Sequence, residues 1–260
     1  MDIVMKMFAS ERREKITQLL KSEKRATVKG LAKEIGVSEA TLRTDLSRME
    51  MDGLLTRTHG GAVLNEEDND TSFAVREKKN RREKLQIAQR AFSMIEEKQC
   101  ILLDASSTAL ELARCIKNKT IRLTVVTTGL QAALELNQNP DVTVIMVGGL
   151  VTKGSGSIEG TLGISLLDYV NIDIMFTSAN GLSAENGLAD FNLYEVQLKK
   201  AIILKAESVV ALIDSSKIEK SSSAVFASLD QIDKVITDKA LSNDVSRKLD
   251  NKQVDVIISG

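Results

Sequence analysis

The chain of 260 residues is poor in the side chains on which several common protein chemistries depend. It has no tryptophan, 3% aromatic residues, two cysteines and a single histidine, His59. One histidine cannot build a histidine-based metal cluster. The scarcity of aromatic rings argues against recognition of unpaired bases by stacking. Among nucleic acids, duplex DNA therefore fits better than unpaired bases, and we predict no metal and no cofactor.

Long apolar runs and secretion signals are also absent. No apolar run approaches the ~20 residues that cross a bilayer, and the N-terminus lacks the apolar core of a signal peptide. Cys100 and Cys115 match no disulfide or metal pattern, which favours buried, reduced thiols. The segment from Gly148 to Gly156 lacks the Gly-Lys-Ser/Thr of a P-loop. We therefore predict a cytoplasmic protein without membrane contact.

The charge of the chain is unevenly distributed. Apolar residues make up 43% of the sequence, enough for a sizeable core, and the formal net charge is only −1. Residues 1–64 hold 12 Lys/Arg against 9 Asp/Glu, whereas the remainder holds 23 against 27. The first part is therefore the basic one, as expected for a small N-terminal domain that binds nucleic acid.

The stretch from Val37 to Ala62 is typical of a helix that meets DNA, followed by a small hairpin. Ser38 can cap the helix, and Leu42, Leu46 and Met49 recur at helical spacing, so they form one buried stripe. Gly53 ends the helix, and a short strand at residues 54–56 leads into a tight turn at residues 57–61. The side chains that point away from the stripe suit base edges and phosphates in a major groove; they are Glu39, Thr41, Arg43, Thr44 and Arg48.

Two shorter helices precede this stretch, and together they predict a winged helix-turn-helix domain over residues 1–64. Ser10 can cap the first helix, and Thr27 can cap a second one, which ends at the turn-permitting Gly36. Residues 65–83 are predicted to be a linker or hinge, acidic at first and then rich in both charges. That charged run is either a solvated helix face or a hinge helix that adds phosphate contacts.

From residue 84 to 260 the pattern changes to apolar runs that alternate with helical segments. Near-continuous Val/Ile/Leu strands separated by helices predict an α/β domain with a mainly parallel sheet. The expected strands are 100–103, 123–127, 142–147, 172–177, 209–213, 235–237 and 254–258, and the expected helices are 109–116, 130–137, 194–206 and 242–249.

Small polar residues follow several of these strands, where ligands bind in parallel sheets. Ser106, Ser107 and Thr108 open a helix whose N–H groups favour an anion. Taken singly, each such hydroxyl is more often a helix cap, and Gly148–Gly149 more often a turn. Together with Lys217 and an acidic residue, they would suit a phosphorylated polyol, with its phosphate on the Ser106–Thr108 helix start near Lys217.

The run Val37–Ala62 resembles the signature of the DeoR family of bacterial transcriptional regulators. The family usually has a second basic residue where this chain has Thr44, which affects base preference. In the second half, the segments that match the DeoR-type sensor domain in order are Leu103–Thr108, Val147–Gly149, Asn180–Gly181, Glu195 with Lys199, and Asp214–Lys217. Ser106, Ser107 and Thr128 depart from the family's usual Gly, Thr and Asn.

The resemblance implies a sensor domain related in fold to sugar-phosphate isomerases, which binds a phosphorylated sugar or related metabolite. The effector contacts that it implies are Asp104, Ser106, Ser107, Thr108, Thr127, Thr128, Gly148, Gly149, Asn180, Gly181 and Lys217. On the DNA side, we assign base reading to Ser38, Thr41, Arg43 and Thr44, with Glu39 beside them, and phosphate contact to Arg48 and Arg57. His59 either contacts a phosphate or holds the turn.

The sequence thus predicts a repressor of carbohydrate-related genes that binds operator DNA as a homodimer or homotetramer, because paired recognition helices meet two half-sites. An effector in the second domain would shift its DNA-binding equilibrium. The alternative is a sugar-phosphate isomerase or deaminase with an accessory DNA-binding domain. In that case Lys217, with Asp104 or Asp214, would transfer a proton between adjacent sugar carbons.

Overall fold

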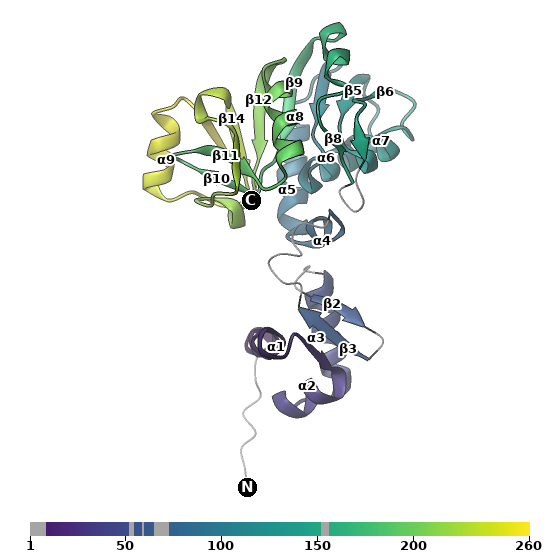
Figure 1. The fold of residues 1–260 in the computed structure, drawn as a ribbon, viewed down its shortest axis with the longest axis vertical. Helices are drawn as coiled ribbons and strands as arrows, with labels where there is room; N and C mark the ends of the chain where they lie inside the picture. Colours follow the sequence, from purple (N-terminus) through teal and green to yellow (C-terminus); the bar gives the residue numbers. More distant parts are fainter. Residues whose placement is uncertain (1–8, 52–54, 59, 65–72, 152–155) are drawn as a thin grey trace. The chain divides into compact units, whose positions relative to one another are not determined.

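The computed structural model describes residues 9–51, 55–58, 60–64, 73–151 and 156–260. The chain divides into two compact units, Met1–Arg81 and Arg82–Gly260, which are described separately here (Figure 1). The division falls within the segment 65–83 that the sequence analysis predicts to be a linker. No helix among the described residues is long and apolar enough to cross a membrane.

The first unit has the helices and the three-stranded sheet of a winged helix-turn-helix. Its elements are α1 (Ala9–Glu23), β1 (Arg25–Thr27), α2 (Val28–Ile35), α3 (Glu39–Met51), β2 (Leu55–Thr58), β3 (Gly61–Leu64) and α4 (Phe73–Lys78). The strands pair antiparallel in the order β1-β3-β2. Strand β1 was not predicted. It lies so close to β3 that a Cβ on Gly61 would stand 2.1 Å from the carbonyl oxygen of Ala26.

The local signals of this unit were mostly right. Thr27 caps α2 by accepting a hydrogen bond from the N–H of Gly30, and Gly36 ends it with φ 77°. The stripe of Leu42, Leu46 and Met49 is fully buried against α1 and α2. Two predicted details are wrong. Ser10 lies inside α1 and not before it, and Arg57 and Thr58 belong to β2 and not to the turn. The predicted helix end at Gly53 lies outside the described residues.

The charged run before the second domain is helical. It forms α4 and the first residues of α5 (Arg81–Phe92), while the acidic part at residues 65–70 lies outside the described residues. Lys84 is buried, so this run is not solvated throughout.

The second unit is built on the predicted parallel sheet. Seven strands pair in the order β15-β14-β12-β9-β4-β5-β6, and every neighbouring pair is parallel. They are β4 (Cys100–Leu103), β5 (Leu123–Thr127), β6 (Val142–Met146), β9 (Ile172–Thr177), β12 (Ala206–Leu212), β14 (Lys234–Thr237) and β15 (Asp255–Ile258). The connecting helices are α6 (Ser107–Lys117), α7 (Leu130–Leu136), α8 (Leu193–Ile203) and α9 (Asn243–Asp250). The fold class and all seven expected strands are confirmed.

Shorter elements that the sequence analysis did not predict surround this sheet. The strands β10 (Gly181–Ser183), β11 (Gly187–Asp190) and β13 (Ala224–Ala227) form a separate antiparallel sheet, and β7 (Leu150–Val151) pairs with β8 (Ile158–Glu159). The described residues of the unit also form the 3-10 helices η2 (Ile164–Tyr169), η3 (Ser215–Lys217) and η4 (Leu229–Gln231).

The core of the second unit explains why its strands lack an alternating pattern. Ile101, Leu102 and Leu103 are successive residues of β4, and all three are fully buried, because both faces of the sheet are covered. The two cysteines are free, as expected, but each is only half buried.

Candidate functional site

The polar residues of the second unit converge where the chain changes direction across the sheet. From β4 the chain proceeds through β5 to β6 on one side, then returns to β9 on the other side of β4. The carboxyl ends of β4 and β9 therefore form the switch point at which open parallel sheets bind ligands. Asp104 follows β4 there, Thr177 is the last residue of β9, and Ser178 follows it.

Asp104 joins the two strands through a dense set of hydrogen bonds. Its Oδ2 accepts bonds from the Thr177 hydroxyl (2.8 Å) and the Ser178 N–H (2.9 Å), and its Oδ1 accepts one from the Ser106 N–H (2.9 Å). The carboxylate is 2% exposed. A buried carboxylate with this many donors holds the backbone of both strand ends in place.

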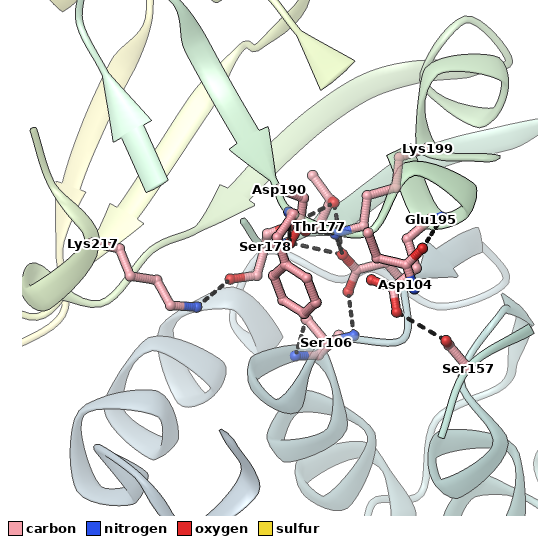
Figure 2. Close-up of polar contacts among 12 residues, drawn as sticks. Asp104, Ser106, Ser157, Thr177, Ser178, Asp190, Glu195, Lys199 and Lys217 are labelled. Atoms are coloured by element: carbon pink, nitrogen blue, oxygen red, sulfur yellow. Dashed lines mark hydrogen bonds and ion pairs between the residues drawn. The ribbon is translucent and has the colours of Figure 1, made fainter. Parts of the chain in front are cut away.

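Lys199 enters the same cluster from α8 (Figure 2). Its Nζ lies 2.8 Å from the Ser178 carbonyl oxygen, 3.0 Å from Asp190 Oδ2 and 3.1 Å from Asp104 Oδ2. It also lies 4.8 Å from the centre of the Phe226 ring, over which an ammonium is attracted. The three oxygens match the three donors of the ammonium group, so its hydrogen-bonding capacity is filled within the protein.

Opposite charges in this cluster overcome the effect of burial. Burial alone would raise the pKa of Asp104, but the charge of Lys199 and the hydrogen bonds of Ser106 and Ser178 lower the pKa below its usual value. Burial alone would lower the pKa of Lys199, but Asp104, Asp190 and Glu195 raise it above its usual value. Asp104 and Lys199 are therefore both ionised at neutral pH.

The start of α6 offers donors beside Asp104. Ser106 is the N-cap, and its Oγ accepts the Ala109 N–H at 3.1 Å. Helix geometry leaves the N–H groups of Ser107 and Thr108 without an intrahelical acceptor. Ser107 is 4% exposed and Thr108 is fully buried, and the Thr108 hydroxyl has no hydrogen-bond partner in the part of the chain that the structure describes. Such a set of buried donors, at the positive end of a helix, suits an anion.

Lys217 borders the same cluster from η3. Its Nζ lies 3.4 Å from the Ser178 hydroxyl and 3.8 Å from Asp214 Oδ2. Asp214 mainly caps η3, because its Oδ1 accepts the Ser216 N–H. Figure 2 shows Lys217 and Ser157 on opposite sides of the group formed by Asp104 and Lys199.

Most of the other predicted effector residues have contacts within the protein; the six are Thr127, Thr128, Gly148, Gly149, Asn180 and Gly181. The Thr127 hydroxyl donates to the Leu103 carbonyl and accepts the Gly129 N–H, so it ties β5 to β4. A Cβ on Gly149 would meet Ile158 and Glu159 of β8, and one on Gly181 would meet the backbone of Lys220. Of the remaining three, Thr128 is buried, Gly148 is exposed, and Asn180 donates its N–H to the Ala189 carbonyl.

A small cavity opens inside the cluster. The centre of a water molecule could occupy about 10 Å³ of this cavity. The polar residues that line it are Asp104, Thr128, Glu195 and Lys199. This is room for about one water molecule. The described residues contain no group of three or more His, Cys, Asp or Glu side chains placed to hold a metal ion.

Several residues of the cluster were absent from the predicted site: Ser157, Thr177, Ser178, Asp190, Glu195 and Lys199. Glu195 and Lys199 carry opposite charges one helical turn apart on α8, and this spacing, together with their match to the sensor domain, was the available signal. Asp190 could not be found in this way, because it ends β11, a strand that was not predicted.

The second candidate site is the exposed face of α3 in the first unit. The Ser38 hydroxyl accepts the Thr41 N–H at 3.1 Å, which confirms the cap, and it shares a 2.9 Å hydrogen bond with the Thr41 hydroxyl. Arg43 is exposed and forms a 3.4 Å ion pair with Glu39. Thr44 and Arg48 are also exposed on this helix. None of the predicted DNA-facing side chains of α3 is buried, and all but the partly buried Thr41 are exposed, while His59 lies outside the described residues.

The hairpin is attached to α3 through Arg57. Its backbone N–H donates to Glu50 Oε1 at 3.0 Å, and its guanidinium donates to the Ser47 hydroxyl at 2.6 Å. On the opposite side of α3, Arg12 of α1 pairs with the buried Asp45 at 2.7 Å. These contacts fix the orientation of α3 within its unit, which the sequence did not reveal.

Comparison with protein families gives two matches along the chain. Residues 12–68 match the DeoR-like helix-turn-helix domain, and residues 79–239 match the DeoR C-terminal sensor domain, which covers more than half of the chain.

Similar proteins include the HTH-type transcriptional regulator GolR of Listeria innocua, which is 40% identical over 97% of this chain and 100% of its own length. The L-fucose operon activator of Haemophilus influenzae is 31% identical over 95% of this chain and 99% of its own length. The lactose phosphotransferase system repressor of Lactococcus lactis is 32% identical over 91% of this chain and 93% of its own length.

Among solved structures, ribose 5-phosphate isomerase A from Methanocaldococcus jannaschii is similar with a TM-score of 0.41 and 21% identity. The likeness covers 54% of this chain and 56% of that protein. It is too low to carry an argument about function.

Proposed function

The chain belongs to the DeoR family of DNA-binding transcriptional regulators, and from this premise we propose that it represses carbohydrate-metabolism genes under the control of a phosphorylated sugar. Membership of a family of regulators also means that the chain is not an enzyme, so the alternative of an isomerase or deaminase is rejected. Lys199, whose donors are filled by the protein, agrees with this assignment.

The start of α6 is the observation that carries the effector proposal. Thr108 has a buried hydroxyl without a partner among the described residues, and buried polar atoms in proteins are nearly always satisfied. A phosphate oxygen would satisfy this hydroxyl together with the N–H groups of Ser107 and Thr108. Lys217 would stand near the other side of the phosphate, through its contact with Ser178. The remaining contacts that we propose are Asp104, Ser106, Thr127, Thr128, Gly148, Gly149, Asn180 and Gly181.

The small size of the cavity supports control of DNA binding by two conformational states of the second unit, one closed and one widened. A sugar phosphate that reached Lys199 would have to widen a cavity that has room for only about one water molecule. An effector that binds the widened state better shifts the population toward it. A shift from 99:1 to 1:99 needs roughly 5.5 kcal/mol of differential binding.

The relatives support a role in sugar genes, because one is named a lactose phosphotransferase system repressor and another an L-fucose operon activator. We assign repression to this chain. Activation would require only a different position of the operator relative to the promoter. We also propose that the chain acts in the cytoplasm, where its DNA is, and as a homodimer or homotetramer, which places two α3 helices on two half-sites.

On the DNA, we propose that Ser38, Thr41, Arg43 and Thr44 read base edges, with Glu39 orienting Arg43. Arg48 and Arg57 would contact phosphates, and His59 would hold the turn or contact a phosphate. Because the Ser38 and Thr41 hydroxyls bond each other and the Thr44 hydroxyl donates to the Ala40 carbonyl, Arg43 carries most of the base reading.

The test uses the full chain and an operator fragment selected from random duplexes. Fluorescence anisotropy would measure DNA affinity with and without each member of a sugar-phosphate panel. We expect one compound to weaken operator binding at least tenfold. Thr108→Val should remove this response without changing the operator affinity that is measured in the absence of the compound. Lys252→Ala, at an exposed ion pair with Asp230, is the control. A full response in Thr108→Val would contradict the proposed phosphate position.

A further inference from the structure

Thr44 is an exposed residue near the middle of α3, and its hydroxyl group is turned back onto the helix. Its Oγ1 donates a hydrogen bond to the Ala40 carbonyl oxygen at 3.1 Å. A hydroxyl has one hydrogen to donate, so this group has none left for an acceptor on a base. What Thr44 offers to a molecule that approaches the helix is therefore chiefly its γ-methyl group.

A second methyl group lies beside the first. Ala40 is exposed and precedes Thr44 by four residues, and side chains at this spacing are neighbours on a helix, with about 5–6 Å between their Cβ atoms. Leu42 and Leu46 are fully buried and lie on the opposite side of α3. The methyl groups of Ala40 and Thr44 thus form a small apolar patch on the exposed side, which we call the methyl patch.

A charged pair borders the methyl patch. Arg43 Nη2 lies 3.4 Å from Glu39 Oε2, and the two side chains are 56% and 48% exposed. Exposed ion pairs contribute little to stability, so Arg43 can leave Glu39 for a base or a phosphate at little cost. The exposed side of α3 therefore presents a cation beside a patch that has no hydrogen to donate.

The major groove of DNA presents one apolar group, the 5-methyl of thymine. In a helix-turn-helix domain the second helix of the pair lies in this groove, and α3 has that place within residues 12–68. An amino or carbonyl group of a base that was pressed against the methyl patch would lose its hydrogen bonds to water. A thymine methyl at the same place would gain apolar contact.

Resting on the proposed assignment of α3 as the helix that reads bases, we propose that the methyl patch recognises thymine through its 5-methyl group, beside the base that Arg43 contacts. Ala40 is thus a residue that determines specificity, and Thr44 contributes through its methyl instead of its hydroxyl. Burial of one methyl group is worth about fourfold in affinity. The contact therefore selects thymine without dominating the binding of DNA.

Replacement of thymine by deoxyuridine in the selected operator tests this inference with the full chain. Each replacement removes one 5-methyl group and keeps base pairing and every hydrogen-bonding group, and fluorescence anisotropy measures the affinity. We expect a loss of about fourfold at one or two thymines of each half-site. In Thr44→Ser, which keeps the hydroxyl and its acceptor, the loss at one of these thymines should fall to about 1.5-fold or less. Thr44→Val, which keeps a γ-methyl but has no hydroxyl, should retain the loss.

Thr17→Ser is the matched control. Thr17 lies on α1, and its hydroxyl donates to the Arg13 carbonyl oxygen at 2.9 Å, the same contact one turn back that Thr44 makes. This variant should keep the fourfold loss. Ala40→Gly should reduce the loss at the same thymine or at its neighbour. The ratio of the thymine and deoxyuridine affinities is compared, because glycine also weakens the helix itself.

The outcomes separate this inference from the proposed function. If the chain binds no selected duplex more tightly than random DNA, the assignment of α3 and this inference both fall. If the selected operator has no thymine, or if all its thymines tolerate deoxyuridine, only the methyl patch is wrong. A loss that persists in both Thr44→Ser and Ala40→Gly would overturn the inference, since other groups would then contact the methyl. So would a loss that disappears in Thr44→Val, because the hydroxyl would then be the reader.

Discussion

Replacement of Lys199 by methionine is the sharpest test of the cluster at the switch point. The substitution keeps much of the side chain's volume but removes the ammonium from between Asp104 and Asp190, which are each 2% exposed. Their Oδ2 atoms both lie within about 3 Å of Nζ, so they are no more than about 6 Å apart. At an effective dielectric constant of about 20, two charges at that distance repel by roughly 3 kcal/mol.

The expected loss of stability follows from this geometry. Removing one partner of a buried ion pair costs about 3–5 kcal/mol, and we expect a value in this range for Lys199→Met. For a unit of this size, 1 kcal/mol shifts the melting temperature by roughly 2–4 °C, so the transition should fall by about 6–20 °C. The matched control is Lys205→Met, whose ammonium is 41% exposed and pairs with Asp168 at the surface. It should cost less than about 1 kcal/mol.

The pH dependence distinguishes lost charge balance from lost packing. In the wild type the pKa of Asp104 is lowered, so its stabilising contribution is present above its unfolded-state pKa of about 3.9 and is lost as the pH falls through the lower folded value. Without Lys199, burial dominates and raises the pKa of Asp104. Protonation then relieves the repulsion, and the gap between variant and wild type should narrow from pH 7 to pH 5.

Calorimetric unfolding of the full chain at both pH values, followed also by circular dichroism, measures the two effects. A melting temperature of Lys199→Met within 2 °C of the control at pH 7 would refute the reasoning. So would a gap that stays constant down to pH 5, since a packing defect does not titrate.

Three further predictions concern the first unit. Arg43→Ala should weaken specific operator binding by about 1–3 kcal/mol, measured by anisotropy, with little change for random duplexes; an equal loss on both would make Arg43 a phosphate contact. Asp45→Ala removes the carboxylate that pairs with the Arg12 guanidinium at a site where both side chains are mostly buried, and should lower the unit's unfolding free energy by about 1–3 kcal/mol in urea titration; no change would show that the pair is weak. Gly36→Ala places a side chain at φ 77° and should lower the unit's unfolding free energy by about 1 kcal/mol. Gly60→Ala, which also has open space around it, is the control for the loss of a glycine as such.

The sequence by itself determined the elements whose signals are local. The period of Leu42, Leu46 and Met49 fixes the buried face of α3, because residues three and four apart share a side of a helix. Thr27 and Gly36 mark the ends of α2 through caps that depend on a few neighbouring atoms. Uninterrupted apolar runs such as Ile101–Leu103 determined a parallel sheet covered on both faces, since only such a strand buries every side chain.

Only the tertiary structure decided what Asp104 does. Its partners Thr177 and Ser178 are 73 and 74 residues away in the chain, and Lys199 reaches it from α8, so no short-range pattern could reveal the cluster. β10 and β11 escaped prediction because strands of three or four residues bury too little surface to leave a pattern. Strand order across the sheet, which brings β4 beside β9, is set by long-range pairing, and this pairing turns scattered polar residues into one site.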